Sequence, residues 1–186
     1  MKRLMWLGCW LVLVSVCAAE PIRVVLLDFE DLTGQKADER LGGTVDTKAL
    51  AGKGMLMLAK QLLTTNQYVL IDRRDFIAQS TRLASPDAKD IRPTYFQAAR
   101  ALRADVILRG SLQSLSTGKQ EVRQGGQEVD LSDVSLRIAL EALNAFDGTV
   151  IAVSDGVAKN SFRQTQAVKT VLGEEDTLQL MEKAIA

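Results

Sequence analysis

The 186-residue sequence contains no histidine and only two cysteines, Cys9 and Cys17, both close to its start. Without an imidazole base, the chain cannot form a Ser-His-Asp or a Cys-His catalytic site. Removal of residues 1–19 would also leave no thiol, which excludes disulfides and zinc sites with nitrogen or sulfur ligands. The fold must then be held by its apolar core alone, and we expect no catalytic residue, no metal and no cofactor.

An excess of charge of one sign is also missing, because 23 basic residues balance 23 acidic ones. Loss of residues 1–19 would take away Lys2 and Arg3 and no acidic residue, leaving a net charge of about −2. Such a surface offers no electrostatic footprint for nucleic acid or anionic lipid. We therefore expect no nucleic-acid partner, and the length of residues 20–186 suits a single domain.

The start of the chain has the composition of an export signal. Two basic residues precede an apolar run at 4–16, and the small residues Cys-Ala-Ala at 17–19 lie directly before Glu20. The run is shorter than the roughly 18 apolar residues that predict a membrane-spanning helix. We predict that residues 1–19 are a signal peptide cleaved after Ala19, and that residues 20–186 form one periplasmic domain.

Lipidation is the alternative outcome of export. An acylated cysteine needs a small residue before it, whereas Cys17 follows the bulky, β-branched Val16. Cys9 follows Gly8 but has too little apolar sequence upstream. Ordinary cleavage is therefore favoured. If Cys17 does carry an acyl chain, that chain would tether the same domain to a membrane, so outer-membrane association depends on this residue.

The first half of the chain alternates between strand and helix patterns. Residues 22–29 are almost continuously apolar and β-branched, which predicts a strand buried on both faces. A polar loop is expected at 30–46. Apolar residues then recur at three- and four-residue spacing over 47–65, which predicts a helix capped by Asp46 or Thr47. The further elements expected in this half are a strand at 68–71, a helix at 76–83, a loop between Ser85 and Pro93, and a helix at 94–103.

Three sequence features of this half each have two interpretations. Gly52 and Gly54 weaken the first helix, or they let it approach the sheet closely. Met55 and Met57 line a ligand groove or, as we prefer, belong to a packed core stripe. The charged run at 72–75 is a recognition point or, preferably, a helix cap with surface ion pairs.

The second half changes to the two-residue period of β-strands. Alternating residues predict strands at 105–115, 134–146 and 149–157, with the even positions from Val134 to Phe146 on a covered face. Asp147-Gly148 is a turn signal, the polar link 116–133 predicts a projecting hairpin tip, and 176–185 predicts a short helix. The order predicts an α/β or α+β fold, with helices packed on a mixed sheet and a C-terminal meander of three strands.

Three acidic residues near the start of the predicted domain are a candidate ligand site. Asp28, Glu30 and Asp31 follow the first predicted strand, where α/β sheets commonly place ligands. As an alternative function, they would form a carboxylate pair or a divalent-cation site of a metal-dependent hydrolase. No second acidic cluster of matching character accompanies them, so this interpretation is disfavoured.

Four phrases, taken in order, resemble the CsgG family and its relative LpoB, which share a TolB-amino-terminal-like domain. The resemblance covers about residues 22–158. The phrases are IRVVLLDFEDLTG at 22–34, YVLIDR at 68–73, ALRADVILRGSL at 101–112, and VSLRIAL at 134–140 leading into DGTV at 147–150.

This resemblance implies a non-enzymatic cell-envelope protein that acts by binding other proteins. We expect a periplasmic adaptor or assembly factor whose partners are envelope proteins, with homo-oligomers as a further possibility. CsgG forms a curli secretion channel, so an outer-membrane secretion component is the second alternative. The candidate hairpins, at 113–133 and 159–172, have few apolar residues or are short, which disfavours a pore.

Overall fold

The computed structural model describes residues 20–34, 46–85, 92–124, 127–164 and 174–186. The predicted signal peptide, most of the predicted loop at 30–46 and part of the second candidate hairpin lie outside these residues. The described elements are β1 (Ile22–Leu26), β2 (Glu30–Asp31), α1 (Thr47–Thr64), β3 (Tyr68–Leu70), α2 (Arg73–Leu83), α3 (Arg92–Ala101), β4 (Val106–Gln124), β5 (Gln127–Asn144), β6 (Val150–Gln164) and α4 (Glu174–Ile185).

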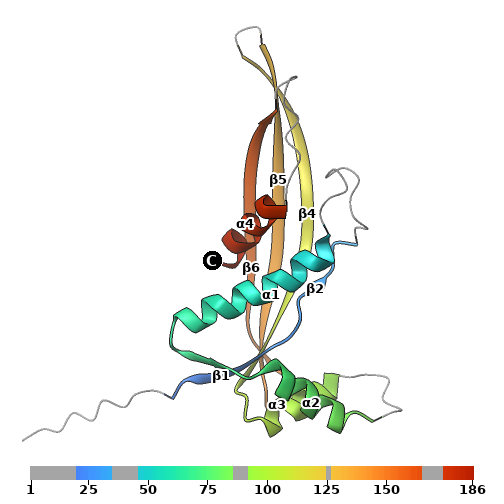
Figure 1. The fold of residues 1–186 in the computed structure, drawn as a ribbon, viewed down its shortest axis with the longest axis vertical. Helices are drawn as coiled ribbons and strands as arrows, with labels where there is room; N and C mark the ends of the chain where they lie inside the picture. Colours follow the sequence, from blue (N-terminus) through green and yellow to red (C-terminus); the bar gives the residue numbers. More distant parts are fainter. Residues whose placement is uncertain (1–19, 35–45, 86–91, 125–126, 165–173) are drawn as a thin grey trace, which may run out of the picture.

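These elements form one mixed six-stranded sheet with four helices packed on it, counted over the described residues. The strand order is β3-β1-β4-β5-β6, and β2 pairs with β4 beyond the end of β1. β1 is parallel to both β3 and β4, whereas β4, β5 and β6 form an antiparallel meander. The predicted fold class and the three-strand meander are confirmed. Figure 1 shows the meander as a tall ribbon that extends far beyond the other elements.

The core consists of two apolar clusters. The larger cluster joins α1 and α4 to the sheet through Leu58, Leu136, Ile138 and Met181. The smaller one joins α2 and α3 to the sheet around Phe76 and includes Val25, Ile107, Ala99 and Leu143. The consecutive residues Val24 and Val25 of β1 point to opposite faces of the sheet, and both are buried because helices cover both faces at this strand. In Figure 1, α2 and α3 lie at the lower end of the sheet, while α1 and α4 lie obliquely across the tall ribbon.

Local capping explains where the helices begin. Asp46 is the N-cap of α1, and its side chain accepts hydrogen bonds from the backbone N–H groups of Lys48 and Ala49. Asp72 caps α2 in the same way through the N–H of Arg74 at 2.7 Å. The cap interpretation of the charged run at 72–75 is therefore confirmed, and α2 begins at Arg73, earlier than predicted. Met55 and Met57 pack against the larger cluster, as expected for a core stripe.

The polar link at 116–133 forms the projecting hairpin that the sequence predicts, but β4 and β5 are longer than predicted, because their ladder continues from the Ser116–Ser135 pair to the Gln124–Gln127 pair. Backbone pairing extends these strands without an alternating apolar pattern. The loop predicted at 30–46 likewise contains β2, which pairs with Ser111 and Leu112 of β4.

Phe146 is the third correction. It was expected on the covered face, but β5 ends at Asn144 and the Phe146 side chain is 74% exposed. Instead, Leu143 and Ala145 are buried, against α2 and α3. The turn that follows holds Gly148 at φ 76°, as the Asp-Gly signal predicts.

Two glycines allow other groups to approach the sheet closely. A Cβ at Gly110 would lie 2.2 Å from the ring of Phe29, and a Cβ at Gly156 would lie 1.9 Å from the carbonyl oxygen of Ala184. Gly156 is therefore the point at which α4 rests on β6. In α1, Gly54 meets Met181 of α4 and Phe29, whereas no atom lies near the position of a Cβ at Gly52.

Candidate interaction surface

The acidic residues after β1 do not form a common site. The Asp28 carboxylate accepts a hydrogen bond from Arg73 of α2 at 2.7 Å. Asp31 instead binds Thr47, the first residue of α1. Glu30 lies between them on β2 and is exposed. No cluster of three or more acidic side chains able to hold a metal ion occurs in the described part of the chain.

Asp31 fastens β2 to α1. Its carboxylate accepts hydrogen bonds from the hydroxyl of Thr47 at 2.5 Å and from the hydroxyl and backbone N–H of Thr33 at 2.7 and 3.0 Å. Burial alone would raise the pKa of Asp31, but these hydrogen bonds outweigh that effect and hold the pKa below its usual value. A carboxylate satisfied in this way has a structural role.

An apolar groove of about 380 Å³ opens between α1 and the sheet. Strands β1, β3, β4, β5 and β6 supply its floor, and Leu58 and Leu62 of α1 form one wall. Besides backbone atoms, only Tyr68 and Ser154 bring polar atoms to the lining. The remaining residues that line it are Ile22, Val24, Val106, Leu108, Leu140, Ala142, Ile151 and Ala152. An uncharged groove of this kind suits apolar side chains.

The groove reaches the free edge of β6 through Ile151, Ala152 and Ser154. Among the described residues, β6 pairs with β5 alone, so its outer edge presents unpaired backbone N–H and C=O groups. The edge strand is long, at 15 residues, and Val150, Ile151, Val153 and Val157 on it are all exposed. Short length, proline or inward charge usually protects such an edge, and β6 has no proline over residues 150–164.

Phe146 extends the apolar surface below the edge. It lies in the turn between β5 and β6, and the guanidinium carbon of Arg100 is 5.9 Å from the ring centroid. A large aromatic side chain left exposed at a turn is a common anchor in protein interfaces. We call the set of Phe146, Val150, Ile151, Val153 and Val157 the β6 flank.

The sequence predicts a strand at 149–157, which the structure extends to Gln164, and an open edge of the three-strand half suits strand addition. The exposed residues of this surface were not predicted, and Phe146 was placed on the covered face. The signal that could have found the flank is the run Thr-Val-Ile-Ala-Val at 149–153, which lacks the strict apolar and polar alternation of a half-covered strand. Apolar residues on both faces of the last strand indicate either a central strand or an edge that pairs with something else.

Comparison with known proteins shows that the fold occurs in other solved structures. No protein-family model and no curated protein matches the sequence. A neuraminyllactose-binding hemagglutinin homolog from Helicobacter pylori has a similar structure, with a TM-score of 0.52 and 12% identity over 89% of this chain and 80% of that one. The protein CT253 from Chlamydia trachomatis gives a TM-score of 0.50 and 15% identity over 76% and 73%. The chain shares its fold with these two proteins.

The C-terminal domain of LpoB from Escherichia coli is also among the similar structures. Its TM-score is 0.43 at 12% identity, over 73% of this chain and 81% of that one. The relation to the CsgG family and to the TolB-like domain stays a prediction from the sequence. Over the described residues, no helix is both long enough and apolar enough to cross a membrane.

Proposed function

We propose that the protein is a non-enzymatic, periplasmic cell-envelope protein that binds other proteins as an adaptor or assembly factor. Its binding surface in this proposal is the β6 flank together with the adjoining groove. The observation that carries the proposal is the outer edge of β6, which has no paired strand within the described part of the chain and exposes valine and isoleucine side chains.

Strand addition is the binding mode that this surface favours. An extended partner segment would gain backbone hydrogen bonds from the β6 edge, and the groove would receive its apolar side chains. The sequence resemblance to the CsgG family and LpoB supports the envelope setting, and the predicted signal at residues 1–19 supports export. The sequence has no histidine, the side chain used most often as a general acid or base, which supports a non-enzymatic role.

The test is site-specific cross-linking in cells. A photoreactive residue replaces Val153 on the flank, and the matched control replaces Leu56 on α1, since the two side chains are 61% and 63% exposed. We expect covalent adducts with another envelope protein from position 153 and none from position 56. Mass spectrometry of the adducts identifies the partner.

Two results would contradict the proposal. One is the absence of any adduct with another protein from position 153. The other is equal labelling from both positions, which would mean that exposed apolar residues of this chain collect neighbours without specificity. Turnover of a substrate by the purified domain would separately refute the non-enzymatic part.

A further inference from the structure

We infer that the β6 edge also binds the β6 strand of a second copy of this chain, antiparallel and centred on Val157. The inference rests on the proposed function in one respect, since it takes the same edge as a binding surface. It adds the identity of a partner and the register of the pairing.

Symmetry restricts the possible registers. When two identical edges pair in an antiparallel manner about a two-fold axis, one residue faces its own copy and all others pair symmetrically around it. The charges on β6 then choose among the registers. With Val157 at the centre, Asp155 of each copy lies opposite Lys159 of the other, so the dimer contains this pair twice.

The other registers are less favourable. A centre at Asp155 places the two Asp155 residues opposite each other, and a centre at Ser161 places Lys159 opposite Arg163. A centre at Lys159 pairs Asp155 with Arg163 but also places the two Lys159 residues opposite each other on the axis. A centre at Val153 leaves both charged residues without a charged partner on the described strand. Opposite charges in facing positions stabilise strand pairs and like charges destabilise them, so the register at Val157 is preferred.

The two charged residues are available for this contact. Both are exposed. Within the sheet they face neutral residues of β5, since Asp155 pairs with Ala139 and Lys159 pairs with Ser135. Between them, Val157 is 47% exposed, so the centre of the contact is apolar.

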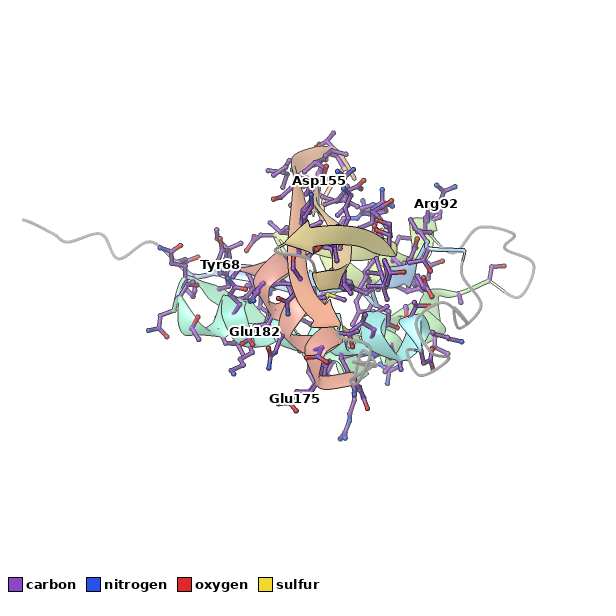
Figure 2. All side chains as sticks on the ribbon, turned by 90° about the horizontal axis from the view of Figure 1, so that it is seen from above. Tyr68, Arg92, Asp155, Glu175 and Glu182 are labelled. Carbon is purple, nitrogen blue, oxygen red and sulfur yellow. The ribbon has the colours of Figure 1, made fainter. Side chains whose placement is uncertain are left out.

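Helix α4 does not cover this face. It rests on β6 at Gly156, and strand residues on either side of Gly156 direct their side chains to the other face of the sheet. Figure 2 agrees, because it shows Asp155 on the far side of the molecule from Glu175 and Glu182 of α4. Asp155, Val157 and Lys159 therefore share the face opposite α4.

Charge reversal tests the register. Residues 20–186 are studied by analytical ultracentrifugation, with circular dichroism to establish folding. Wild type is expected to dimerise. The D155K variant and the K159D variant each place two like-charged pairs across the axis, so each should weaken the dimer by about tenfold or more. Added salt should weaken the wild-type dimer and strengthen the dimers of these variants.

Mixing supplies the decisive measurement. In a mixture of D155K and K159D chains, every facing pair is again opposite in charge, so a one-to-one heterodimer should form although each variant alone is largely monomeric. The double variant D155K/K159D should also regain the dimer. Lys48→Asp makes the same charge change at an exposed position on α1 and should leave dimerisation unchanged.

A wild-type chain that stays monomeric at its highest soluble concentration would overturn the inference. A dimer that neither charge reversal weakens would also overturn it, because another surface would then hold the copies together. Cross-linking from Val153 separates this inference from the proposed function. If position 153 cross-links only to a second copy, the dimer is supported and the adaptor function is contradicted. If the chain is monomeric and position 153 cross-links to another protein, the adaptor function is supported and the dimer is contradicted.

Discussion

At the scale of single residues, the hydrogen bond between Thr47 and Asp31 joins the first turn of α1 to the sheet. Thr47 is only 4% exposed, so loss of its hydroxyl leaves the carboxylate without its partner on that side. We predict that Thr47→Val lowers the free energy of unfolding by about 1–2 kcal/mol at pH 7. Thr47→Ser keeps the hydroxyl and should lose less. Urea unfolding of the three proteins measures the differences.

The same pair predicts a pH dependence. Because the pKa of Asp31 is lowered by folding, its contribution to stability is complete above the ordinary aspartate pKa of about 3.9. That contribution is lost as the pH falls through the lower pKa of the folded state. The gap in unfolding free energy between wild type and Thr47→Val should therefore be full at pH 7 and shrink below about pH 4. A gap that is constant down to pH 2 would contradict the role given to Asp31.

Phe146 is expected to matter for binding and not for folding. Its exposed ring contributes little buried area, so Phe146→Ala should change the unfolding free energy by less than about 0.5 kcal/mol. It should nevertheless reduce the yield of adducts from a photoreactive residue at position 153. Phe76→Ala is the comparison, since Phe76 is buried beside α3 and its loss should cost about 3–5 kcal/mol. Unchanged adduct yield from Phe146→Ala would remove this residue from the binding surface.

At the scale of elements, the packing of α4 on β6 depends on the missing side chain at Gly156. A methyl group there would overlap the backbone of Ala184, so Gly156→Ala should displace α4 and cost about 1–3 kcal/mol. Gly52→Ala is the matched control, because its methyl group meets open space and its helix propensity improves by about 1 kcal/mol. Thermal unfolding should place the two variants on opposite sides of wild type. Equal stability of Gly156→Ala and wild type would mean that α4 is not held at this point.

The sequence predicted elements well where side chains alternate or recur, and poorly where the backbone alone decides. The helix predicted at 47–65 matches α1 closely, because apolar spacing and the capping residue Asp46 mark it. The strand predicted at 68–71 matches β3 closely as well. The extension of β4 and β5 through 116–133 carries no such pattern. Pairing between two polar strands depends on register and on the neighbouring strand, which one segment of sequence does not contain.

The candidate surface follows the same rule. The groove assembles from five strands and one helix, and no short motif links Ile22, Leu58 and Ala152. The acidic group at 28–31 was adjacent in sequence, yet Asp28 and Asp31 bind different helices. Sequence proximity is thus a weak guide to sites that depend on the order of strands in a sheet.

At the scale of the whole molecule, the sequence predicts both export and the form of the exported chain. We predict that the exported protein begins at Glu20 and carries no acyl group, because Val16 is too bulky to precede a lipidated cysteine. Intact mass spectrometry of the protein from cells reads this directly. A mass that corresponds to a chain starting at an acylated Cys17 would place the domain on a membrane instead.

The position of β1 has a consequence for how the chain folds. Both of its hydrogen-bonded neighbours, β3 and β4, come later in the chain, and Arg23 donates its backbone N–H to Asp105 at 2.8 Å. If the chain is exported as predicted and emerges N-terminus first, the edge of β1 that pairs with β4 stays open until β4 has arrived, and such long-range pairing is slow. A fragment that ends at Ala104 should therefore precipitate or bind chaperones, whereas residues 20–186 refold. If the chain is exported as predicted, chaperones that hold unfolded chains would then determine how much of it reaches the folded state.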